Sequence, residues 1–330
     1  WVQVGANLGT NASYVQIYAD PTGNLYVAYI DVAAGSKLAL KKYDYIAGTW
    51  DALNPADSST LYVSTGNVNQ VSSKFSGLRY SIAFDSFNTP YVAFTDAGLI
   101  PYVKKFNSNT AVWETLGAGP ATSGIAALPS LAIDSTDKPW LLYTKLTATG
   151  DTAGTLALFS FNGTAWTESV NPTPIGGVRQ SCIANNGTNK LCIAMFDTGN
   201  TNRTTVVYFD KTAATWSGKT TLSTRDGQGI GLVNDVAGNL YCSYIDKYDS
   251  AVYAQVGRVH KLAIDGTSWT ELSNSAATRG IDEPTDKLSI AVGSAPYPYI
   301  VYTKTNSSSV ITPIARLYAP PPPPAPPVKE

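Results

Sequence analysis

Pairs of short apolar runs, separated by a polar turn, recur along the whole chain. The stretch YVQIYADPTGNLYVAYID, residues 14–31, aligns without a gap with five later stretches. These copies occupy residues 79–96, 128–145, 180–197, 229–246 and 287–304. Because runs rich in Tyr, Val and Ile bounded by turn residues indicate strands, each copy predicts a β-hairpin. Such internal similarity indicates a repeat architecture with this hairpin in every unit.

Each hairpin is predicted to close through a turn of defined chemistry. In the first copy the turn reads Asp20-Pro21-Thr22-Gly23, in which Asp caps the turn, Pro presets φ and Gly accepts a positive φ. The same position is aspartate in three more copies, as Asp85, Asp134 and Asp235. The run after the turn, LYVAYI, is apolar at consecutive positions. This continuity predicts a strand buried on both faces between neighbouring sheets.

Two further runs follow the hairpin in most copies. The third run lies at residues 37–44, 101–107, 155–162 and 204–210. The fourth opens on a tryptophan, at Trp50, Trp113, Trp166, Trp216 and Trp269. Four antiparallel strands in about 50 residues are the blade of a β-propeller. We expect the repeated Trp to pack blade against blade rather than to stack on sugars.

The two ends of the chain complement each other. The third run of the sixth copy ends at Tyr318, directly before the prolines, and has no Trp run after it. The N-terminal stretch WVQVGANLG, residues 1–9, is a Trp run with nothing before it and resembles residues 113–119. We therefore expect residues 1–9 to complete blade six, which closes the ring and removes a bare sheet edge. An open solenoid is the alternative, and the complementary ends argue against it.

The predicted fold is thus all-β, with one domain and a tail. Residues 1–319 are expected to form a six-bladed β-propeller of four-stranded antiparallel blades, closed by the N-terminal strand. Residues 320–330 are expected to form a C-terminal polyproline II segment. The chain resembles extracellular β-propeller repeats of the form "sLAiDs.g.pYvaYtD…lkkyd…gtW" over residues 1–319. That resemblance implies a fold but no single function, because propellers include lectins, hydrolases, lyases and scaffolds.

Composition and charge favour an extracellular protein. Charged residues are only 14% of the chain, against roughly 25% in typical soluble domains. The net charge is −1 and no basic stripe is present, so a nucleic-acid partner is not expected. No apolar run approaches the ~20 residues of a membrane helix. The chain begins at Trp1, which we interpret as the start of a mature or excerpted segment.

Candidate chemistry is sparse. His260 is the single histidine and falls in a predicted third run, away from a channel, so we expect a structural role for it. No His/Cys cluster with metal spacing is present. We therefore expect no catalytic residue, no cofactor and no dedicated metal site.

One ring of charges is a weak candidate for a site at the rim of the propeller. Four copies end their second run in aspartate, at Asp31, Asp96, Asp197 and Asp246. The other two copies carry Lys145 and Lys304 at this position. The ring could bind a cation or a polar ligand. The favoured alternative is a solvated rim of compensating charges, because repeats stack equivalent residues into rings.

Two of the three cysteines are a disulfide candidate. Cys182 and Cys192 flank one predicted hairpin turn. If that turn centres on Gly187, they lie directly opposite and can be bridged. In the register of the first copy they lie diagonally, roughly 7–8 Å apart, which strains a disulfide. Both registers remain open. Cys242 stands in the place of Val27, and we expect a buried thiol there.

Glycosylation is expected at two kinds of residue. The N-glycosylation sequons all fall in predicted turns or interstrand loops, at Asn11, Asn162, Asn186, Asn202 and Asn306. The tail PPPPPAPP, beside a Ser/Thr-rich domain, resembles the hydroxyproline-rich glycoproteins of green-algal cell walls and flagellar surface fibres. That resemblance implies O-glycans on hydroxylated Pro320, Pro321, Pro322, Pro323, Pro324, Pro326 and Pro327. A plain stiff linker is the alternative.

The expected function is that of a non-catalytic, secreted structural glycoprotein. It would be a subunit of an extracellular fibre, cell wall or surface appendage, with the propeller as scaffold and the tail as connector. Its expected partners are other copies of itself or other extracellular glycoproteins, together with covalent glycans. A carbohydrate-binding propeller is the first alternative, and a propeller hydrolase or lyase is the second.

Overall fold

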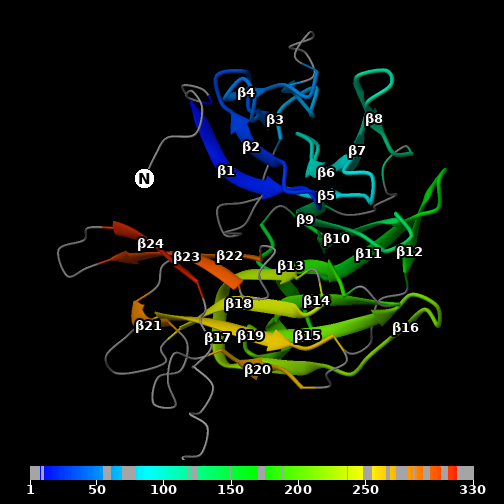
Figure 1. Cartoon of the computed structure of the whole chain (residues 1–330). Helices are drawn as coiled ribbons and strands as arrows, with labels where there is room; N and C mark the ends of the chain where they lie inside the picture. The colour runs from blue at the N-terminus through cyan, green and yellow to red at the C-terminus, as the bar shows by residue number, and fades with distance from the viewer. Residues whose placement is uncertain are drawn as a thin grey trace, which may run out of the picture.

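The computed structural model is all-β, and the described residues include one short 3-10 helix of three residues, η2 (Thr198–Asn200). Its antiparallel sheets are arranged as a β-propeller (Figure 1). Among the described residues no helix is long and apolar enough to span a membrane. The structure describes residues 8, 11–54, 61–68, 79–117, 119, 125–148, 150–169, 175–186, 189–235, 237–247, 255–264, 268–272, 281–284, 287–292, 298–305 and 311–317.

All six sequence copies form the predicted antiparallel hairpins, which we number as repeat units 1 to 6. Their strand pairs in chain order are β1 (Ala12–Ala19) with β2 (Leu25–Asp31), β5 (Tyr80–Phe84) with β6 (Pro90–Thr95), β9 (Ile125–Ile133) with β10 (Pro139–Leu146), β13 (Val178–Asn185) with β14 (Lys190–Asp197), β17 (Thr220–Asn234) with β18 (Leu240–Lys247), and β22 (Lys287–Val292) with β23 (Pro298–Thr305). The turns of these hairpins lie at one end of the propeller, which we call the turn end. The opposite end is called the loop end.

Third and fourth strands extend the hairpins outwards. The third strands are β3 (Lys37–Asp44), β7 (Pro101–Asn107), β11 (Thr155–Phe161), β15 (Arg203–Asp210), β19 (Gln255–Leu262) and β24 (Ile311–Leu317). The fourth strands are β4 (Thr49–Asp51), β8 (Val112–Thr115), β12 (Trp166–Ser169), β16 (Thr215–Trp216) and β20 (Thr270–Glu271), and β21 (Ile281–Pro284) also pairs with β19. Units 1, 2 and 3 are separate four-stranded sheets, and unit 6 has three described strands. Units 4 and 5 share a nine-stranded sheet, because β17 pairs with β15 and then with β18.

An apolar cluster joins each unit to the next from unit 1 to unit 6. Tyr26 and Leu40 of unit 1, for example, pack with Val92 and Phe94 of unit 2. Equivalent clusters lie between units 2 and 3, 3 and 4, 4 and 5, and 5 and 6. The second strands of units 1 to 5 are buried on both faces, as their continuous apolarity predicts, and β6 is buried throughout. In unit 6, by contrast, Tyr299 and Val301 of β23 are exposed. Burial of each large apolar side chain stabilises the fold by about 1.5–3 kcal/mol, so these interfaces hold the molecule together.

The repeated tryptophans take part in these interfaces, as predicted. Four of these tryptophans contact the apolar cluster that their own unit shares with the preceding unit, namely Trp113, Trp166, Trp216 and Trp269. The indole Nε1 of Trp166 also donates to the Leu116 carbonyl of unit 2, at 2.7 Å. In unit 1, the Trp50 ring contacts the Tyr43 ring in a tilted arrangement, with ring centroids 5.0 Å apart.

The innermost strands are also bonded to one another. The Ser81 hydroxyl of unit 2 accepts the Leu131 N–H of unit 3 at 3.0 Å. The equivalent Ser130 hydroxyl accepts the Ile183 N–H of unit 4 at 3.1 Å. These bonds set the spacing of successive units around the centre. The expected closing strand, apart from Leu8, and the expected polyproline segment lie outside the described residues.

Candidate functional site

The aspartate at the hairpin turn is a buried carboxylate with many partners. Oδ1 of Asp20 accepts the backbone N–H groups of Thr22, at 3.0 Å, and Asn24, at 2.9 Å. Its Oδ2 accepts the Asn24 amide at 2.8 Å and the Tyr26 hydroxyl at 3.2 Å. Burial alone would raise the pKa of Asp20, but the hydrogen bonds from Asn24 and Thr22 outweigh it and lower that pKa. The carboxylate therefore stays ionised and closes the turn.

The same arrangement recurs at the turns of units 2, 3 and 5. Asp85, Asp134 and Asp235 are each buried. Oδ1 of each accepts the N–H groups two and four residues further on, at 2.8 to 3.2 Å. In unit 4, Asn186 takes this position and is also buried. The sequence therefore predicts the capping role correctly, and the structure adds that the capping group is inside the protein.

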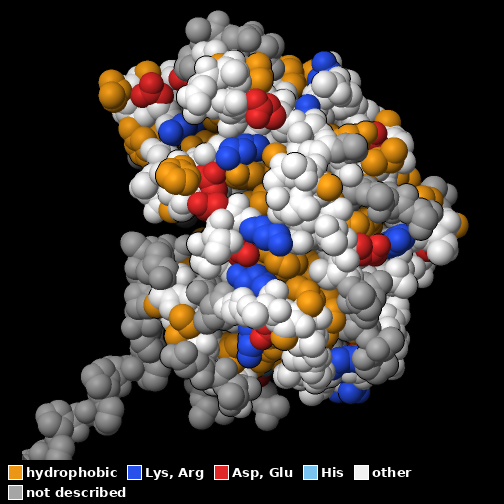
Figure 2. All heavy atoms as spheres, turned by 90° about the vertical axis from the view of Figure 1, so that its right-hand side faces the viewer, with side chains coloured by type: hydrophobic (Ala, Val, Ile, Leu, Met, Phe, Trp, Pro, Cys, Tyr) orange, Lys and Arg blue, Asp and Glu red, His pale blue; other side chains and the backbone are white. Residues whose placement is uncertain are grey.

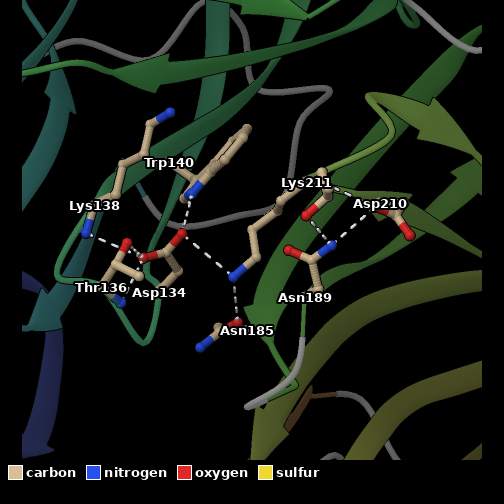
Figure 3. Close-up of polar contacts among 9 residues, drawn as sticks. Asp134, Thr136, Lys138, Trp140, Asn185, Asn189, Asp210 and Lys211 are labelled. Carbon is tan, nitrogen blue, oxygen red and sulfur yellow. Dashed lines mark hydrogen bonds and ion pairs between the residues drawn. The ribbon is translucent and has the colours of Figure 1, made fainter.

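Asp134 is the most heavily engaged of these carboxylates (Figure 3). It accepts the Thr136 hydroxyl at 2.7 Å and the indole Nε1 of Trp140 at 3.0 Å. Lys211 of unit 4 reaches across the interface and places its Nζ 3.3 Å from Oδ2, with the two side chains only 10% and 4% exposed. Burial opposes ionisation, but the hydrogen bonds from Thr136 and Trp140 prevail and lower the pKa of Asp134 to about 2. This buried ion pair fastens unit 3 to unit 4.

Neighbouring groups hold Lys211 in place. Its Nζ is also 3.5 Å from Oδ1 of Asn185, at the end of β13 (Figure 3). The Asn189 amide donates to Oδ1 of Asp210 at 3.0 Å, which anchors the start of the β15–β16 connection that carries the lysine. Units 2 and 3 are joined at this end as well, because the backbone N–H and hydroxyl of Ser86 both donate to the Asp137 carboxylate at 2.7 Å.

An aromatic ring and a lysine accompany each turn aspartate. The residue six positions after the aspartate is Tyr26, Tyr91, Trp140 or Tyr241. A lysine ammonium lies 4.9 to 5.6 Å from each ring centroid, from Lys42, Lys105, Lys138 and Lys261 respectively. Figure 2 shows basic and acidic side chains following one another across the side of the molecule on which β16 lies. Sequence reasoning missed these partners, although the fixed spacing from aspartate to aromatic residue was a usable signal.

The buried aspartates at the turn end, with their hydrogen-bond partners, are chemically suited to stabilising the fold. The carboxylate oxygens already accept several internal donors, and their lowered pKa values at Asp20 and Asp134 remove them from proton transfer near neutral pH. Among the described residues, no group of three or more His, Cys, Asp or Glu side chains is arranged to hold a metal ion.

At the loop end, two of the rim aspartates cap their own connections. Oδ1 of Asp31 accepts the Ala34 N–H at 3.1 Å, and its Oδ2 accepts the Tyr62 hydroxyl at 2.9 Å. Oδ1 of Asp96 accepts the Ile100 N–H at 2.9 Å. Lys145, at the same repeat position in unit 3, is 3.9 Å from Glu168. The side chain of Lys304 lies outside the described residues.

The other two rim aspartates are buried rather than solvated. Asp197 is fully buried, 2.6 Å from the Lys219 ammonium, and accepts the Gly199 N–H at the start of η2. Asp246 lies 3.6 Å from Nε of Arg258, whose other end contacts Glu271 at 2.7 Å. Burial raises the pKa of Asp246 to about 6, against the opposing attraction of Arg258. Each rim carboxylate therefore has its own local partner.

His260 lies inside unit 5. Its imidazole is 8% exposed and stacks on Tyr244, with ring centroids 5.5 Å apart. It faces Cys242 across the β18–β19 pair, and burial lowers its pKa. The ring is thus a neutral packing element, in keeping with the expected structural role.

The cysteines are three free thiols. Cys182 lies opposite Ala194 and Cys192 lies opposite Ala184, so the two occupy the diagonal register. The disulfide candidate is therefore not formed in this structure, because Asn186 places the turn in the same register as the aspartate turns. Cys242 joins both in the apolar cluster between units 4 and 5. Burial raises the pKa of Cys182 to about 12, which leaves that thiol unreactive.

The sequons differ in accessibility. Asn11 and Asn162 are exposed, and Oδ1 of Asn162 accepts the Ala165 N–H at 2.8 Å in its turn. Asn202 is partly buried with a φ of 56°. Asn186 is 6% exposed at a turn position, so a glycan there would require the hairpin to open. Asn306 and the tail prolines lie outside the described residues.

Comparison with solved structures supports the β-propeller class. A protein of unknown function from Dyadobacter fermentans matches with a TM-score of 0.60 and 10% identity, covering 95% of this chain and 96% of its own. An ulvan lyase of a new polysaccharide lyase family matches with a TM-score of 0.56 and 10% identity, over 90% and 78%. The lectin SapL1, bound to α-methyl fucoside, matches with a TM-score of 0.54 and 11% identity, over 94% and 97%.

These likenesses concern the fold alone, because the identities are low and the matched proteins differ in activity. No family model matches the sequence. No curated protein matches it either.

Proposed function

We propose that this protein is a non-catalytic structural glycoprotein, secreted and built into an extracellular fibre, cell wall or surface appendage. The observation that supports the proposal is that the repeated carboxylates are occupied by contacts within the protein. At the turn end they are buried and accept internal donors, and at the loop end each has its own partner. Charged side chains deployed in this way stabilise a scaffold.

The proposed scaffold is a six-bladed ring closed by residues 1–9. The Tyr244 hydroxyl of unit 5 donates at 3.1 Å to the carbonyl of Leu222, which lies in the part of β17 that pairs with β15 of unit 4. Tyr29 holds the same repeat position in unit 1, and its hydroxyl donates to the Leu8 carbonyl, also at 3.1 Å. Lys41 adds a contact to the same carbonyl at 3.2 Å. Leu8 thus stands to unit 1 as Leu222 stands to unit 5, which supports a closing strand just before it.

The proposed connector is the proline-rich tail at residues 320–330. A polyproline II helix rises about 3.1 Å per residue without internal hydrogen bonds, so it acts as a stiff spacer. Hydroxylation and glycosylation of its prolines would coat this spacer with sugar. Exposed Asn11 and Asn162 are the proposed N-glycan sites. Other copies of the chain, or other extracellular glycoproteins, are the proposed partners.

Intact and peptide-level mass spectrometry of natively isolated protein tests this proposal. We expect a ladder of pentose or hexose masses on the peptide that contains residues 320–327. We also expect N-glycans at Asn11 or Asn162 and none at buried Asn186. Unhydroxylated, unmodified prolines would remove the main support for a wall or fibre role.

Carbohydrate binding is the second candidate, and one pair of residues favours it. Tyr14, on the innermost strand of unit 1 near the loop end, is 37% exposed. The Arg79 guanidinium stacks 4.4 Å from its ring centroid and donates to its hydroxyl at 3.1 Å. An aromatic ring beside a guanidinium suits a sugar that carries an acidic group. Glycan-array binding lost in Tyr14→Ala, but kept in a Tyr45→Ala control at the turn end, would favour this candidate.

A hydrolase or lyase is the third candidate. Turnover of a glycoside or lactone that disappears in Asp31→Ala or Asp246→Asn would replace the scaffold proposal.

A further inference from the structure

All three cysteines of the chain lie at one interface, between units 4 and 5. Cys192 of unit 4 and Cys242 of unit 5 are fully buried there, and Cys182 of unit 4 packs beside them while partly exposed. The apolar clusters at the other four interfaces contain no cysteine. The fold therefore gathers thiols from two units at a single place.

The repeat indicates which two of these thiols face each other. Cys182 occupies the position of Ser81 and Ser130, whose hydroxyls accept an N–H from the inner strand of the next unit at 3.0 and 3.1 Å. The equivalent N–H in unit 5 belongs to Leu232, which lies directly opposite Cys242 in the β17–β18 pair. Directly opposed residues of an antiparallel pair have Cα atoms about 4.5–5.5 Å apart. Cys182 is therefore placed toward Cys242 across the interface.

Cys192 is less well placed for a bridge. It lies diagonally from Cys182 in its own hairpin, where Cα atoms are roughly 7–8 Å apart, and a disulfide usually needs about 4.4–6.8 Å. Across the next strand pair it faces Tyr208, whose hydroxyl accepts Nε1 of Trp269 at 2.9 Å. Burial raises the pKa of the Cys242 thiol, and Cys182 raises it further, more than Cys192 does. Cys182 and Cys242 are thus the pair that interacts more strongly across the interface.

We propose that Cys182 and Cys242 form a disulfide between units 4 and 5 when the protein meets a small-molecule disulfide such as oxidised glutathione. The partly exposed Cys182 is the entry point. Its sulfur attacks one sulfur of the oxidant, which releases one reduced glutathione and leaves a mixed disulfide. The Cys242 sulfur then attacks the Cys182 sulfur and displaces the second glutathione. The two thiols lose two electrons and two protons in all, and the oxidant takes up both as two glutathione thiols.

The bridge would fasten unit 4 to unit 5 covalently in an oxidising extracellular setting. It would stabilise the fold by closing the loop between the two cysteines in the unfolded chain. Burial raises the pKa of Cys182 to about 12, so little thiolate is present near neutral pH and the exchange is slow in the folded protein. The rate should rise with pH up to that pKa, because the thiolate is the attacking species.

The test uses the full chain, reduced and folded, with oxidised glutathione at about pH 8.5, near the ordinary pKa of a thiol. A parallel sample is refolded in a glutathione redox mixture, so that the thiols meet the oxidant before units 4 and 5 pack together. Remaining thiols are then alkylated under denaturing conditions, and peptides are analysed by mass spectrometry without reduction. We expect Cys182 joined to Cys242, Cys192 alkylated, and a higher melting temperature than in the reduced protein. A Cys182–Cys192 bridge, or three alkylated cysteines in both samples, would overturn the proposal.

The repeat supplies replacements that equivalent interfaces already contain. Cys182→Ser introduces the residue of units 2 and 3, and Cys242→Val introduces the residue of units 1 and 2. Cys242→Val should stop at the mixed disulfide and accumulate glutathione on Cys182, whereas Cys182→Ser should give neither adduct nor bridge. Cys192→Ala is the matched control and should form the bridge as the wild type does. Loss of the bridge in Cys192→Ala, or its persistence in Cys182→Ser, would contradict the assigned pair.

Discussion

At the scale of single residues, aspartates that look alike in the sequence have opposite electrostatic environments. Asp134 accepts hydrogen bonds from Thr136 and Trp140, which lower its pKa to about 2 although burial opposes them. Asp246 is also buried, but the attraction of Arg258 does not offset the effect of burial, which raises its pKa to about 6. The number of hydrogen-bond donors that face each carboxylate, more than the depth of burial, decides whether its ionised or its protonated form is favoured.

Loss of the Asp134 carboxylate is expected to be costly. Asp134→Ala removes the acceptor of several hydrogen bonds and leaves the Lys211 ammonium buried without its counter-charge. The expected loss in the free energy of unfolding is about 2–4 kcal/mol, measured by urea denaturation. Asp44→Ala is the matched control, because Asp44 also caps a turn, through Ile46 and Ala47, but is exposed. An equal loss in both variants would contradict a special role for the buried pair.

Asp246 is expected to make stability depend on pH near 6. Its pKa in the folded protein lies above the ordinary value of 3.8, so the folded state binds the proton more tightly than the unfolded state. The wild type should therefore gain stability, relative to Asp246→Asn, as the pH falls from 7.5 to 4.5. The gain is at most about 3 kcal/mol, since one pKa unit corresponds to about 1.4 kcal/mol. Thermal melts that shift in parallel for both proteins over this range would disprove the prediction.

At the scale of elements, the repeat pattern predicts strand positions well. The third-run boundaries at 37–44 and 101–107 coincide with β3 and β7, because apolar runs between turn residues leave few alternatives. The long β17 was not predicted. It pairs with units 4 and 5 in succession, and that depends on the neighbouring strand rather than on its own residues. The register of Cys182 and Cys192 likewise became definite only with the turn in place.

Two equivalent tyrosines provide a test of the unit-to-unit contact. Tyr29→Phe and Tyr244→Phe each remove one hydroxyl that donates to a backbone carbonyl, of Leu8 and of Leu222 respectively. If both contacts belong to the same interface, each change should lower the free energy of unfolding by about 0.5–1.5 kcal/mol. Tyr45→Phe, at an exposed turn, should change it much less. A neutral Tyr29→Phe beside a destabilising Tyr244→Phe would argue against an N-terminal strand in this place.

At the scale of the whole molecule, the propeller is a series of similar interfaces, and the proposed closed ring requires units 6 and 1 to meet. Five successive apolar clusters join units 1 to 6. At the proposed sixth junction, between units 6 and 1, four apolar residues are exposed, namely Val15, Ile17, Tyr299 and Val301. Stability is therefore expected to be lowest at this junction.

The two chain ends should contribute very differently to stability. Removal of residues 1–9 is expected to lower the melting temperature, because the proposed closing strand would no longer be there to pair with β24. Removal of residues 320–330 is expected to leave the melting temperature unchanged, since the tail follows the last strand of the propeller. Differential scanning calorimetry of both truncated proteins measures this. A loss of stability on tail removal would mean that the tail packs on the propeller.

The sequence alone determined the repeat, the hairpins, the antiparallel third strands and the turn aspartates. These features are local, since each follows from the spacing of apolar and turn residues within one copy. Only the tertiary structure showed that Lys211 of unit 4 reaches Asp134 of unit 3 and that Asp197 and Asp246 are buried. Such contacts join residues that are distant in the chain, and their energies depend on burial and on the charges that face each other, neither of which a single repeat encodes.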